Sequence, residues 1–373
     1  MKKFSQFTYR HIGSDSKNQD LMLKEIGCKS LKDLLKSTLP NNILQNDSLD
    51  IPVLDTEIEM LDEMSALSRT NKNFKSYIGM GYYNNITPSV IHRNMIQDPG
   101  WYTAYTPYQP EISQGRLEML MNFQQLIIDM TKLDVANASL LDEGTAAAEA
   151  MTLCFRHAFD KNKNTYLVHS LCHPQTISVI KTRAKPLNIK IKLCDEFKEI
   201  DLKRCFGILF QYPDTFGHLS DLENLIKICH NNKALVCVAT DLLSLALLKP
   251  PGEMDADVVL GNSQRFGTPL GFGGPHAAFF ATKNKFIRSM PGRIIGVTRD
   301  KREKNTYRMT LQTREQHIRR DKATSNICTS QALLANVSAA YAVYHGPEGI
   351  KVIAENIHEK TKVLAQAIKT KFK

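Results

Sequence analysis

Ala234-Leu235-Val236-Cys237-Val238-Ala239-Thr240-Asp241 is an uninterrupted apolar run that a single carboxylate closes. A short, valine-rich run of this kind is typical of a strand buried on both faces. Similar β-type runs recur at residues 165–170, 207–212, 257–260 and 276–282, and helical patterns at 176–187 and 219–232 lie between the early ones. Strands that alternate with helices of this length predict an α/β fold with a mainly parallel sheet covered on both faces.

The chain before this region reads as helical and then irregular. Residues 20–35 carry apolar side chains at helical spacing, interrupted by Gly27, which predicts two short helices, and residues 55–67 predict another. Residues 71–110 are rich in Tyr, Gly and Pro, a composition typical of a ligand-lining or interface segment.

A long amphipathic helix is predicted to begin near Ser113, because Leu117, Leu120, Phe123 and Ile127 share one face. The last stretch, 329–373, reads as two helices separated by His345-Gly346-Pro347. These patterns predict a helical N-terminal extension over residues 1–70, a large domain over 71–330, and the helical start of a C-terminal region over 331–373.

Bulk composition indicates a soluble globular protein. The 373 residues are 42% hydrophobic and 23% charged. No run is long and apolar enough to span a membrane, and Met1-Lys2-Lys3-Phe4 does not begin a secretory signal. The eight cysteines are scattered without a CxxC pair, which favours reduced thiols in the cytoplasm.

The net charge of +10 is concentrated between Arg293 and Lys322, where ten Lys and Arg residues face four Asp and Glu residues. Three interpretations stay open for this stretch: a solvated loop and helix face, a docking surface for an acidic protein or ligand, and a nucleic-acid contact. No recognition motif or aromatic platform accompanies the charge, which argues against nucleic acid.

Three local motifs have a structural and a functional interpretation. Residues 137–149 form a turn that enters an Ala-rich helix, which is either an ordinary cap or a phosphate cradle, although Asp142 and Glu143 would repel a phosphate. Gly271-Phe272-Gly273-Gly274-Pro275 precedes a β-type run, which favours a tight turn over a dinucleotide fingerprint. His169, Cys172 and His173 lack the further ligands that zinc needs, so we expect no metal site.

Asp241 is the most informative single residue. A carboxylate at the end of an apolar strand is costly unless it has a partner. It either pairs with the protonated ring nitrogen of a cofactor or caps the helix that follows.

Several longer motifs resemble the glycine cleavage system P-protein family, the decarboxylating glycine dehydrogenases. They are Arg10-His11-Ile12-Gly13, Tyr77-Ile78-Gly79-Met80-Gly81-Tyr82-Tyr83, the segment 99–116, the segment 140–149, Ser263-Gln264-Arg265-Phe266-Gly267 and the segment 271–276. The likeness extends from about Tyr9 to the end. It implies the fold of the aspartate-aminotransferase class of pyridoxal-phosphate (PLP)-dependent transferases. Within the family, the chain resembles the N-terminal half, which also exists as a separate first subunit.

The resemblance also implies a cofactor site without its catalytic residue. The other half of the family carries a His-Lys-Thr triplet whose lysine binds PLP covalently, and the corresponding triplet here is Ser263-Gln264-Arg265. A glutamine amide cannot condense with an aldehyde. Asp241 and His173 then correspond to the pyridinium-binding acid and the ring-stacking histidine, so that His173, Asp241 and Gln264 form a relic cofactor site.

The implied activity belongs to an assembly. A lysine-bearing second subunit holds PLP, and the two subunits, expected as a heterotetramer, decarboxylate glycine and transfer the aminomethyl group to the lipoyl arm of H-protein. The isolated chain is expected to be inactive. Candidate residues for the shared pocket are Tyr82, Tyr83, Tyr102, Tyr105 and Gln109, with turn packing as the alternative, and Arg302, Lys304 and Arg308 are candidates for docking H-protein.

One departure from the family pattern leaves other interpretations open. A first subunit normally continues into a smaller C-terminal domain, whereas this sequence stops at Lys373, as a truncated chain or a fragment would. The alternatives are a free-standing PLP enzyme that uses another lysine, such as Lys249, and an inactive, truncated interaction module.

Overall fold

The computed structural model describes residues 11–371, except 12, 46, 48, 53, 55, 103–106, 108, 161, 196–198, 312–315 and 324–330. The chain divides into two compact units, Met1–Lys75 and Ser76–Lys373. The predicted boundary after residue 70 lies close to this division, and the domain limits themselves stay a prediction.

The first unit contains the three helices that the sequence predicts: α2 (Ser16–Glu25), α3 (Leu31–Thr38) and α4 (Glu57–Thr70). Each begins at a residue whose side chain accepts a backbone N–H of the first turn, namely Asp15, Ser30 and Thr56. Thr56 and Glu59 complete a capping box at α4. These caps explain where the helices begin, since their apolar residues are mostly exposed.

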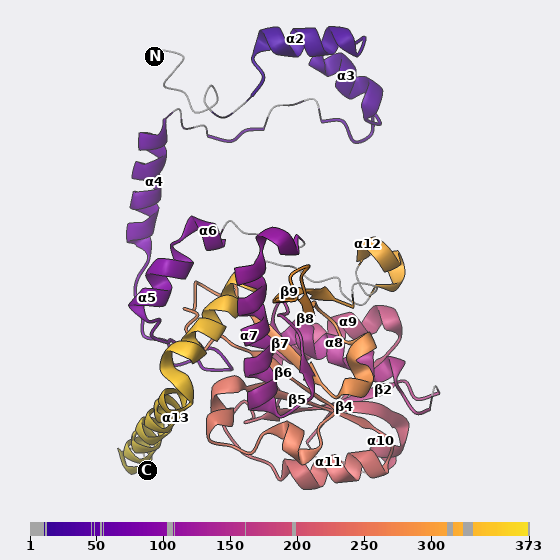
Figure 1. The fold of residues 1–373 in the computed structure, drawn as a ribbon, viewed down its shortest axis with the longest axis vertical. Coiled ribbons are helices and arrows are strands. Elements are labelled where there is room, and N and C mark those ends of the chain that lie inside the picture. Colours follow the sequence, from indigo (N-terminus) through magenta and orange to yellow (C-terminus); the bar gives the residue numbers. More distant parts are fainter. Residues whose placement is uncertain are drawn as a thin grey trace. The chain divides into compact units, whose positions relative to one another are not determined.

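The second unit is built on a seven-stranded sheet with the order β1-β7-β6-β5-β4-β2-β3 (Figure 1). Its strands are β1 (Val135–Ala136), β2 (Thr165–His169), β3 (Lys190–Cys194), β4 (Cys205–Tyr212), β5 (Leu235–Asp241), β6 (Val258–Asn262) and β7 (Ala278–Thr282). The pairs from β3 to β6 are parallel, which confirms the predicted fold. β7 runs antiparallel to β6 and β1 because no crossover helix lies between residues 263 and 277.

Helices cover both faces of this sheet: α7 (Gln114–Thr131) and α11 (Leu222–Asn231) lie on one side, and α8 (Glu143–Arg156) and α9 (Pro174–Ala184) on the other. The second unit also contains α5 (Ser89–Ile91), α6 (Pro99–Tyr102), α10 (Glu199–Arg204), α12 (Gln316–Arg319) and α13 (Ala332–Lys371), with a π-helix at His92–Ile96. The first half of α13 packs beside α7, and a non-helical Gly346 separates its two halves, as the sequence predicts.

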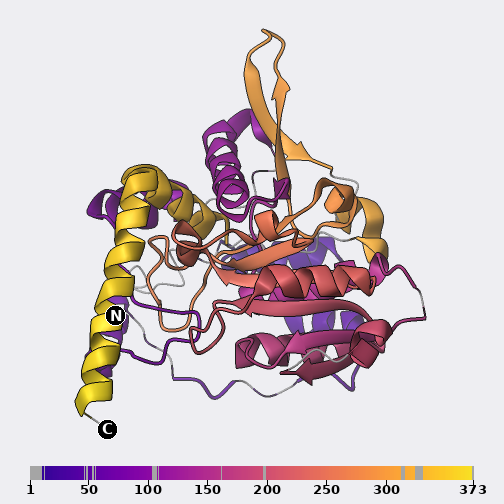
Figure 2. The ribbon, with the colours of Figure 1, turned by 90° about the horizontal axis from the view of Figure 1, so that it is seen from below.

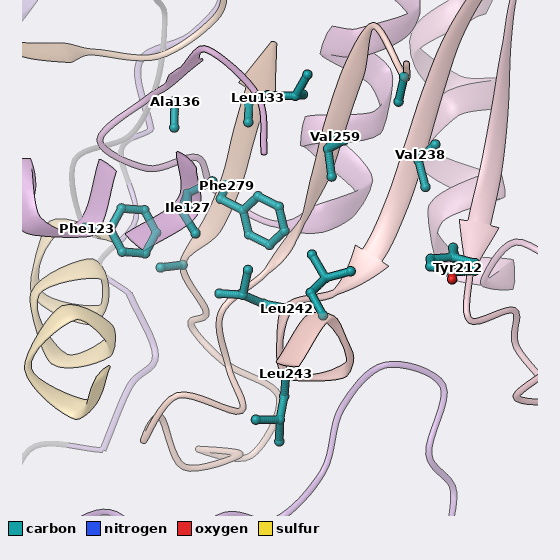
Figure 3. Close-up of a cluster of buried hydrophobic side chains, with 14 of the residues drawn as sticks. Phe123, Ile127, Leu133, Ala136, Tyr212, Val238, Leu242, Leu243, Val259 and Phe279 are labelled. Atoms are coloured by element: carbon teal, nitrogen blue, oxygen red, sulfur yellow. The ribbon is translucent and has the colours of Figure 1, made fainter. Parts of the chain in front are cut away.

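The core has one layer on each side of the sheet. On β5, Val236 and Val238 point to the side of α7 and α11, whereas Cys237 and Ala239 point to the side of α8 and α9. Figure 3 shows Phe123 and Ile127 of α7 within the first layer. Both are fully buried, and a fully buried side chain of this size stabilises the fold by about 1.5–3 kcal/mol. This confirms the apolar face predicted for the helix.

A β-hairpin replaces the predicted loop and helix face in the basic stretch. β8 (Ile294–Arg299) and β9 (Asn305–Thr310) pair in antiparallel register, and Figure 2 shows the hairpin projecting from the sheet. Gln124 of α7 holds its base, because the amide donates to Ile295 O at 3.1 Å and accepts from Ile295 N at 2.8 Å. Of the three interpretations of the basic stretch, the loop and helix face is therefore wrong in its secondary structure at residues 294–310, while the short α12 agrees with it.

Candidate functional site

The carboxyl ends of the parallel strands gather polar side chains at one edge of the sheet. β5 ends at Asp241 and β6 at Asn262, while α8 and α9 begin at the same edge, after Asp142 and His173. Ligands of open α/β sheets bind at this edge, because strand ends and helix N-termini meet there. We describe it as the carboxyl-edge site.

Asp241 has two partners at this site. One carboxylate oxygen accepts the backbone N–H of Leu243 at 3.1 Å, which caps the short 3-10 helix Leu242–Ala246. The other oxygen forms an ion pair with the guanidinium of Arg265. The capping interpretation of Asp241 is therefore confirmed, and the arginine explains how the strand end tolerates a carboxylate.

Gln264 is fully buried and its amide is saturated with hydrogen bonds. Its Nε2 donates to the backbone oxygens of Tyr83 and Thr268, each at 2.7 Å, and its Oε1 accepts the backbone N–H of Tyr83 at 3.2 Å. The backbone of Gln264 is held as well, since its N–H donates to Asn262 and its oxygen accepts from Asn85. The side chain joins two parts of the chain that are 181 residues apart.

The tyrosine segment, residues 81–87, lies across this site. A Cβ on Gly81 would lie only 2.9 Å from Nε2 of His173, so glycine alone allows this approach, at φ +91°. The ring of Tyr82 lies on that of His276, with centroids 4.6 Å apart. The guanidinium of Arg265 lies 4.8 Å above the ring centroid of Tyr83.

Glu143 supplies a buried carboxylate at the first turn of α8. Asn262 donates to it at 3.1 Å and Thr176 at 3.3 Å. Burial raises the pKa of Glu143 to about 7, against these two hydrogen bonds and with help from the charges of Asp241 and Asp142. Asp142 accepts the backbone N–H of Thr145 at 2.7 Å, which confirms the ordinary helix cap.

Burial also shifts the pKa values of the aromatic side chains at the site. It lowers the pKa of His173 and of His276, which favours neutral rings near pH 7. His173 shares a hydrogen bond with the hydroxyl of Thr215 at 3.1 Å. Burial raises the pKa of Tyr82, and the negative charges of Glu143 and Asp142 raise it further.

The structure thus brings together five of the predicted site residues: Tyr82, Tyr83, His173, Asp241 and Gln264. The contacts above do not include Tyr102, which is 53% exposed at the end of α6, or the exposed Gln109. Tyr105 lies outside the described residues. The roles predicted for all of these residues stay predictions.

Sequence reasoning missed three members of the site: Arg265, Asn262 and His276. Arg265 and Asn262 flank Gln264 closely in sequence, and a polar strand end is a signal that could have identified Asn262. His276 follows the Gly-rich turn, and only its contact with Tyr82 shows its place in the site.

The predicted docking residues lie on the hairpin. Asp300 organises its turn by accepting the backbone N–H groups of Arg302 at 2.7 Å and Lys304 at 3.0 Å. Arg308 lies on β9 opposite Gly296. All three basic side chains are exposed.

None of the helices among the described residues is long and apolar enough to cross a membrane. Nowhere among these residues do three or more His, Cys, Asp or Glu side chains gather as a metal site would require.

Comparison with known proteins identifies relatives over nearly the whole chain. The family model of the glycine cleavage system P-protein matches residues 9–373. The chain is 57% identical to a decarboxylating glycine dehydrogenase of Pelagibacter ubique over 97% of its own length and 38% of the relative. It is 53% identical to a second such protein, of Pseudomonas putida, over 100% of its own length and 39% of the relative. The chain therefore spans about two fifths of these curated relatives.

Solved structures give the same result. The chain is 34% identical to a glycine decarboxylase (P-protein) of the glycine cleavage system in inhibitor-bound form, with a TM-score of 0.85, covering 96% of this chain and 82% of that one. A sphingosine-1-phosphate lyase of Burkholderia pseudomallei matches with a TM-score of 0.60 at 11% identity, over 90% and 78% of the two chains, which shows the fold alone. These likenesses confirm the predicted fold class of PLP-dependent transferases.

PLP is used in this family, but the carboxyl-edge site does not fit it. Gln264 offers no amine, and Arg265 already neutralises Asp241. Glu143 and Asp142 place carboxylates at the helix start where a phosphate would bind, and Gly81 lies against His173. If the correspondence expected from the family resemblance holds, these side chains fill the contact points that the cofactor would use.

Proposed function

Since this chain belongs to the glycine cleavage system P-protein family, we propose that it is the non-catalytic component of a glycine decarboxylase. It acts with a lysine-bearing second subunit, which holds PLP and with which it forms a heterotetramer. The assembly decarboxylates glycine and transfers the aminomethyl group to the lipoyl arm of H-protein. PLP supplies the electron sink for this chemistry in the partner subunit.

The observation that carries the proposal is the state of Gln264. Gln264, which the resemblance matches to the PLP-binding lysine of the other half of the family, is a fully buried amide whose two N–H groups and oxygen are all hydrogen-bonded. Such a group neither attacks an aldehyde nor acts as a general acid or base near pH 7. The role left for this chain is to shape the shared pocket, for which Tyr82, Tyr83, Tyr102, Tyr105 and Gln109 are the candidates.

The free-standing enzyme is the second candidate, and the position of Lys249 argues against it. The ammonium of Lys249 is ion-paired with Glu223 of α11 at 2.5 Å, and its side chain is 47% exposed. A Schiff-base lysine needs a site that lowers its pKa, whereas the hydrogen bond to Glu223 raises the pKa of Lys249.

The cytoplasm is the compartment that we propose. All seven cysteines in the described part of the chain are free thiols, and six of them are buried. Reduced thiols of this kind are typical of a reducing compartment.

Exchange of labelled bicarbonate into the carboxyl group of glycine tests the proposed activity. We expect no exchange from the isolated chain, and clear exchange once the lysine-bearing subunit and lipoylated H-protein are added. Exchange by the isolated chain would contradict the proposal. So would an assembly whose activity does not depend on this chain.

A further inference from the structure

The tyrosine segment has no regular secondary structure, yet five hydrogen bonds that involve side chains fix it to the loop that follows β6. Gln264 bonds to both the N–H and the oxygen of Tyr83. Asn85 donates to Gln264 O at 2.7 Å and to Thr268 O, and Thr87 donates to Gly267 O at 2.7 Å. All five bonds therefore join the tyrosine segment to the anchor loop, residues 264–268, which accepts four of them and donates one, from Gln264 Nε2 to Tyr83 O.

We propose that Gln264 is a positioning residue that latches the tyrosine segment across the carboxyl-edge site. Its amide presents a donor and an acceptor to a single residue, as a neighbouring strand would. Lysine offers donors only, and ionised glutamate offers acceptors only. Glutamine at this position thus does more than remove a reactive amine, because its amide supplies both the donor and the acceptor that pair with the backbone of Tyr83.

The latch determines where the aromatic groups lie. With Tyr83 held, Gly81 rests against His173, Tyr82 rests on His276, and Arg265 spans from Asp241 to the ring of Tyr83. Met80, directly before the segment, accepts at its backbone oxygen from Gln175 of α9 at 2.9 Å. The segment therefore lies over the polar strand ends of the carboxyl-edge site, and the Tyr83 side chain stays 41% exposed to solvent.

One consequence rests on the proposed function: if the tyrosines line a shared pocket, then Gln264 sets their position for the partner subunit. The latch itself does not depend on that function, because all of its contacts lie within this chain. The two ideas can therefore fail separately.

Amide hydrogen exchange of the full chain tests the latch. Gln264→Met keeps the size of the side chain but removes its hydrogen bonds, and Gln264→Glu keeps one acceptor and removes both donors. We expect exchange of the Tyr83 N–H, which the latch binds, to become at least about tenfold faster in both variants, the factor that about 1.4 kcal/mol sets. Unchanged protection of the Tyr83 N–H in a folded Gln264→Met protein would overturn the proposal.

Gln124 provides a matched control, because its buried amide bridges both backbone groups of Ile295 in the same way. Gln124→Met should release β8 and leave the Tyr83 N–H protected. Asn85→Asp tests the latch from the other side, because its carboxylate no longer donates to Gln264 O or Thr268 O. If the Gln264 variants do not fold, faster exchange of the Tyr83 N–H in Asn85→Asp supports the latch and unchanged exchange contradicts it.

Turnover in the assembled enzyme separates positioning from a merely structural role. We expect Gln264→Met to lower kcat several-fold and to leave the KM for H-protein unchanged, with a full complement of folded complex. If the wild-type assembly has no activity, the proposed function fails, and hydrogen exchange still decides the latch. Faster exchange with unaltered kcat would limit Gln264 to holding the segment and overturn its positioning role.

Discussion

The guanidinium of Arg265 contacts the carboxylate of Asp241, so the acid at the end of β5 is neutralised by this chain itself. Arg265 follows directly on Gln264 in the sequence. A substitution at Gln264 therefore leaves the contact between Arg265 and Asp241 in place.

We therefore predict that Gln264→Lys alone does not restore a PLP site. The new ammonium would lie beside Arg265, and Glu143 and Asp142 would still repel a phosphate at α8. Borohydride treatment in the presence of PLP, followed by peptide mapping, should give no stoichiometric pyridoxyllysine at position 264. A single stoichiometric adduct there would show that the site accepts the cofactor after all. The wild-type chain serves as the control and should give no stoichiometric adduct at Lys249 or elsewhere.

A second prediction concerns the buried carboxylate of Glu143. Its pKa is about 7 in the folded protein and 4.5 in the reference state, so the folded state holds this proton more tightly. Stability should therefore fall as pH rises from about 4.5 to 7, by about 3 kcal/mol in total. Glu143→Gln abolishes the ionisation while its amide still pairs with Asn262 and Thr176. We expect this variant to be more stable than the wild type at pH 8, by up to about 3 kcal/mol.

Urea unfolding at pH 5 and pH 8 measures the effect. Glu118→Gln, on the exposed side of α7, controls for the loss of a carboxylate in solvent. If Glu143→Gln destabilises the protein equally at both pH values, the carboxylate is held as an anion and the raised pKa is wrong.

A third prediction concerns Asp257, at the other end of β6, whose pKa is lowered where that of Glu143 is raised. It accepts from His230 at 2.8 Å and from Val236 N–H at 3.0 Å, and Lys283 and Lys285 lie at 3.2 and 3.4 Å. Burial favours the neutral acid, but these hydrogen bonds and charges outweigh it and lower the pKa of Asp257 to about 2. Its stabilisation, about 2–3 kcal/mol, is complete above about pH 5 and should be lost as pH falls from 4 to 2.

Asp257→Asn should cost about 2–3 kcal/mol at pH 7, because it removes the carboxylate that pairs with His230 and Lys283. Acid unfolding curves should then be flatter in the variant than in the wild type below pH 4. Asp129→Asn, at an exposed position of α7, is the control. An equal slope in the Asp257 variant and the wild type would mean that Asp257 does not titrate as described.

Much of the sheet could be predicted from the sequence, and the exceptions have physical reasons. β5 is readable because both of its faces are buried, so its apolar residues are continuous. β3 was missed because it is an edge strand with Lys190 and Lys192 exposed, and a strand half in water need not look apolar. The β8–β9 hairpin was missed for a related reason: beyond Ile294, Ile295 and Met309 it buries little.

The site was predictable only in part. His173, Asp241 and Gln264 follow from the family resemblance, and the Asp142 cap follows from helix chemistry. The latch between Gln264 and Tyr83 joins residues 181 positions apart, and no local pattern encodes such a contact. The pairing of Arg265 with Asp241 is hidden likewise, because it depends on the registry of β5 with β6.

The last prediction concerns the hairpin and H-protein. Arg302 and Lys304 lie in its turn and Arg308 on β9, all exposed on an element that projects from the sheet (Figure 2). H-proteins of this system are expected to be acidic, and complementary charge mainly raises the association rate. Salt screens such attraction over about 8 Å at physiological ionic strength. Replacing all three residues with glutamate should raise the KM for H-protein several-fold and flatten its salt dependence, while the KM for glycine barely changes.

Replacing Lys181, Lys185 and Lys190 with glutamate changes the net charge equally, on exposed residues of α9 and β3 and the turn between them. Because that control changes the net charge of the chain but leaves the hairpin intact, it should raise the KM for H-protein much less than the hairpin variant does. An equal rise in both triple variants would indicate net charge rather than docking, and no rise in either would make the hairpin a solvated surface.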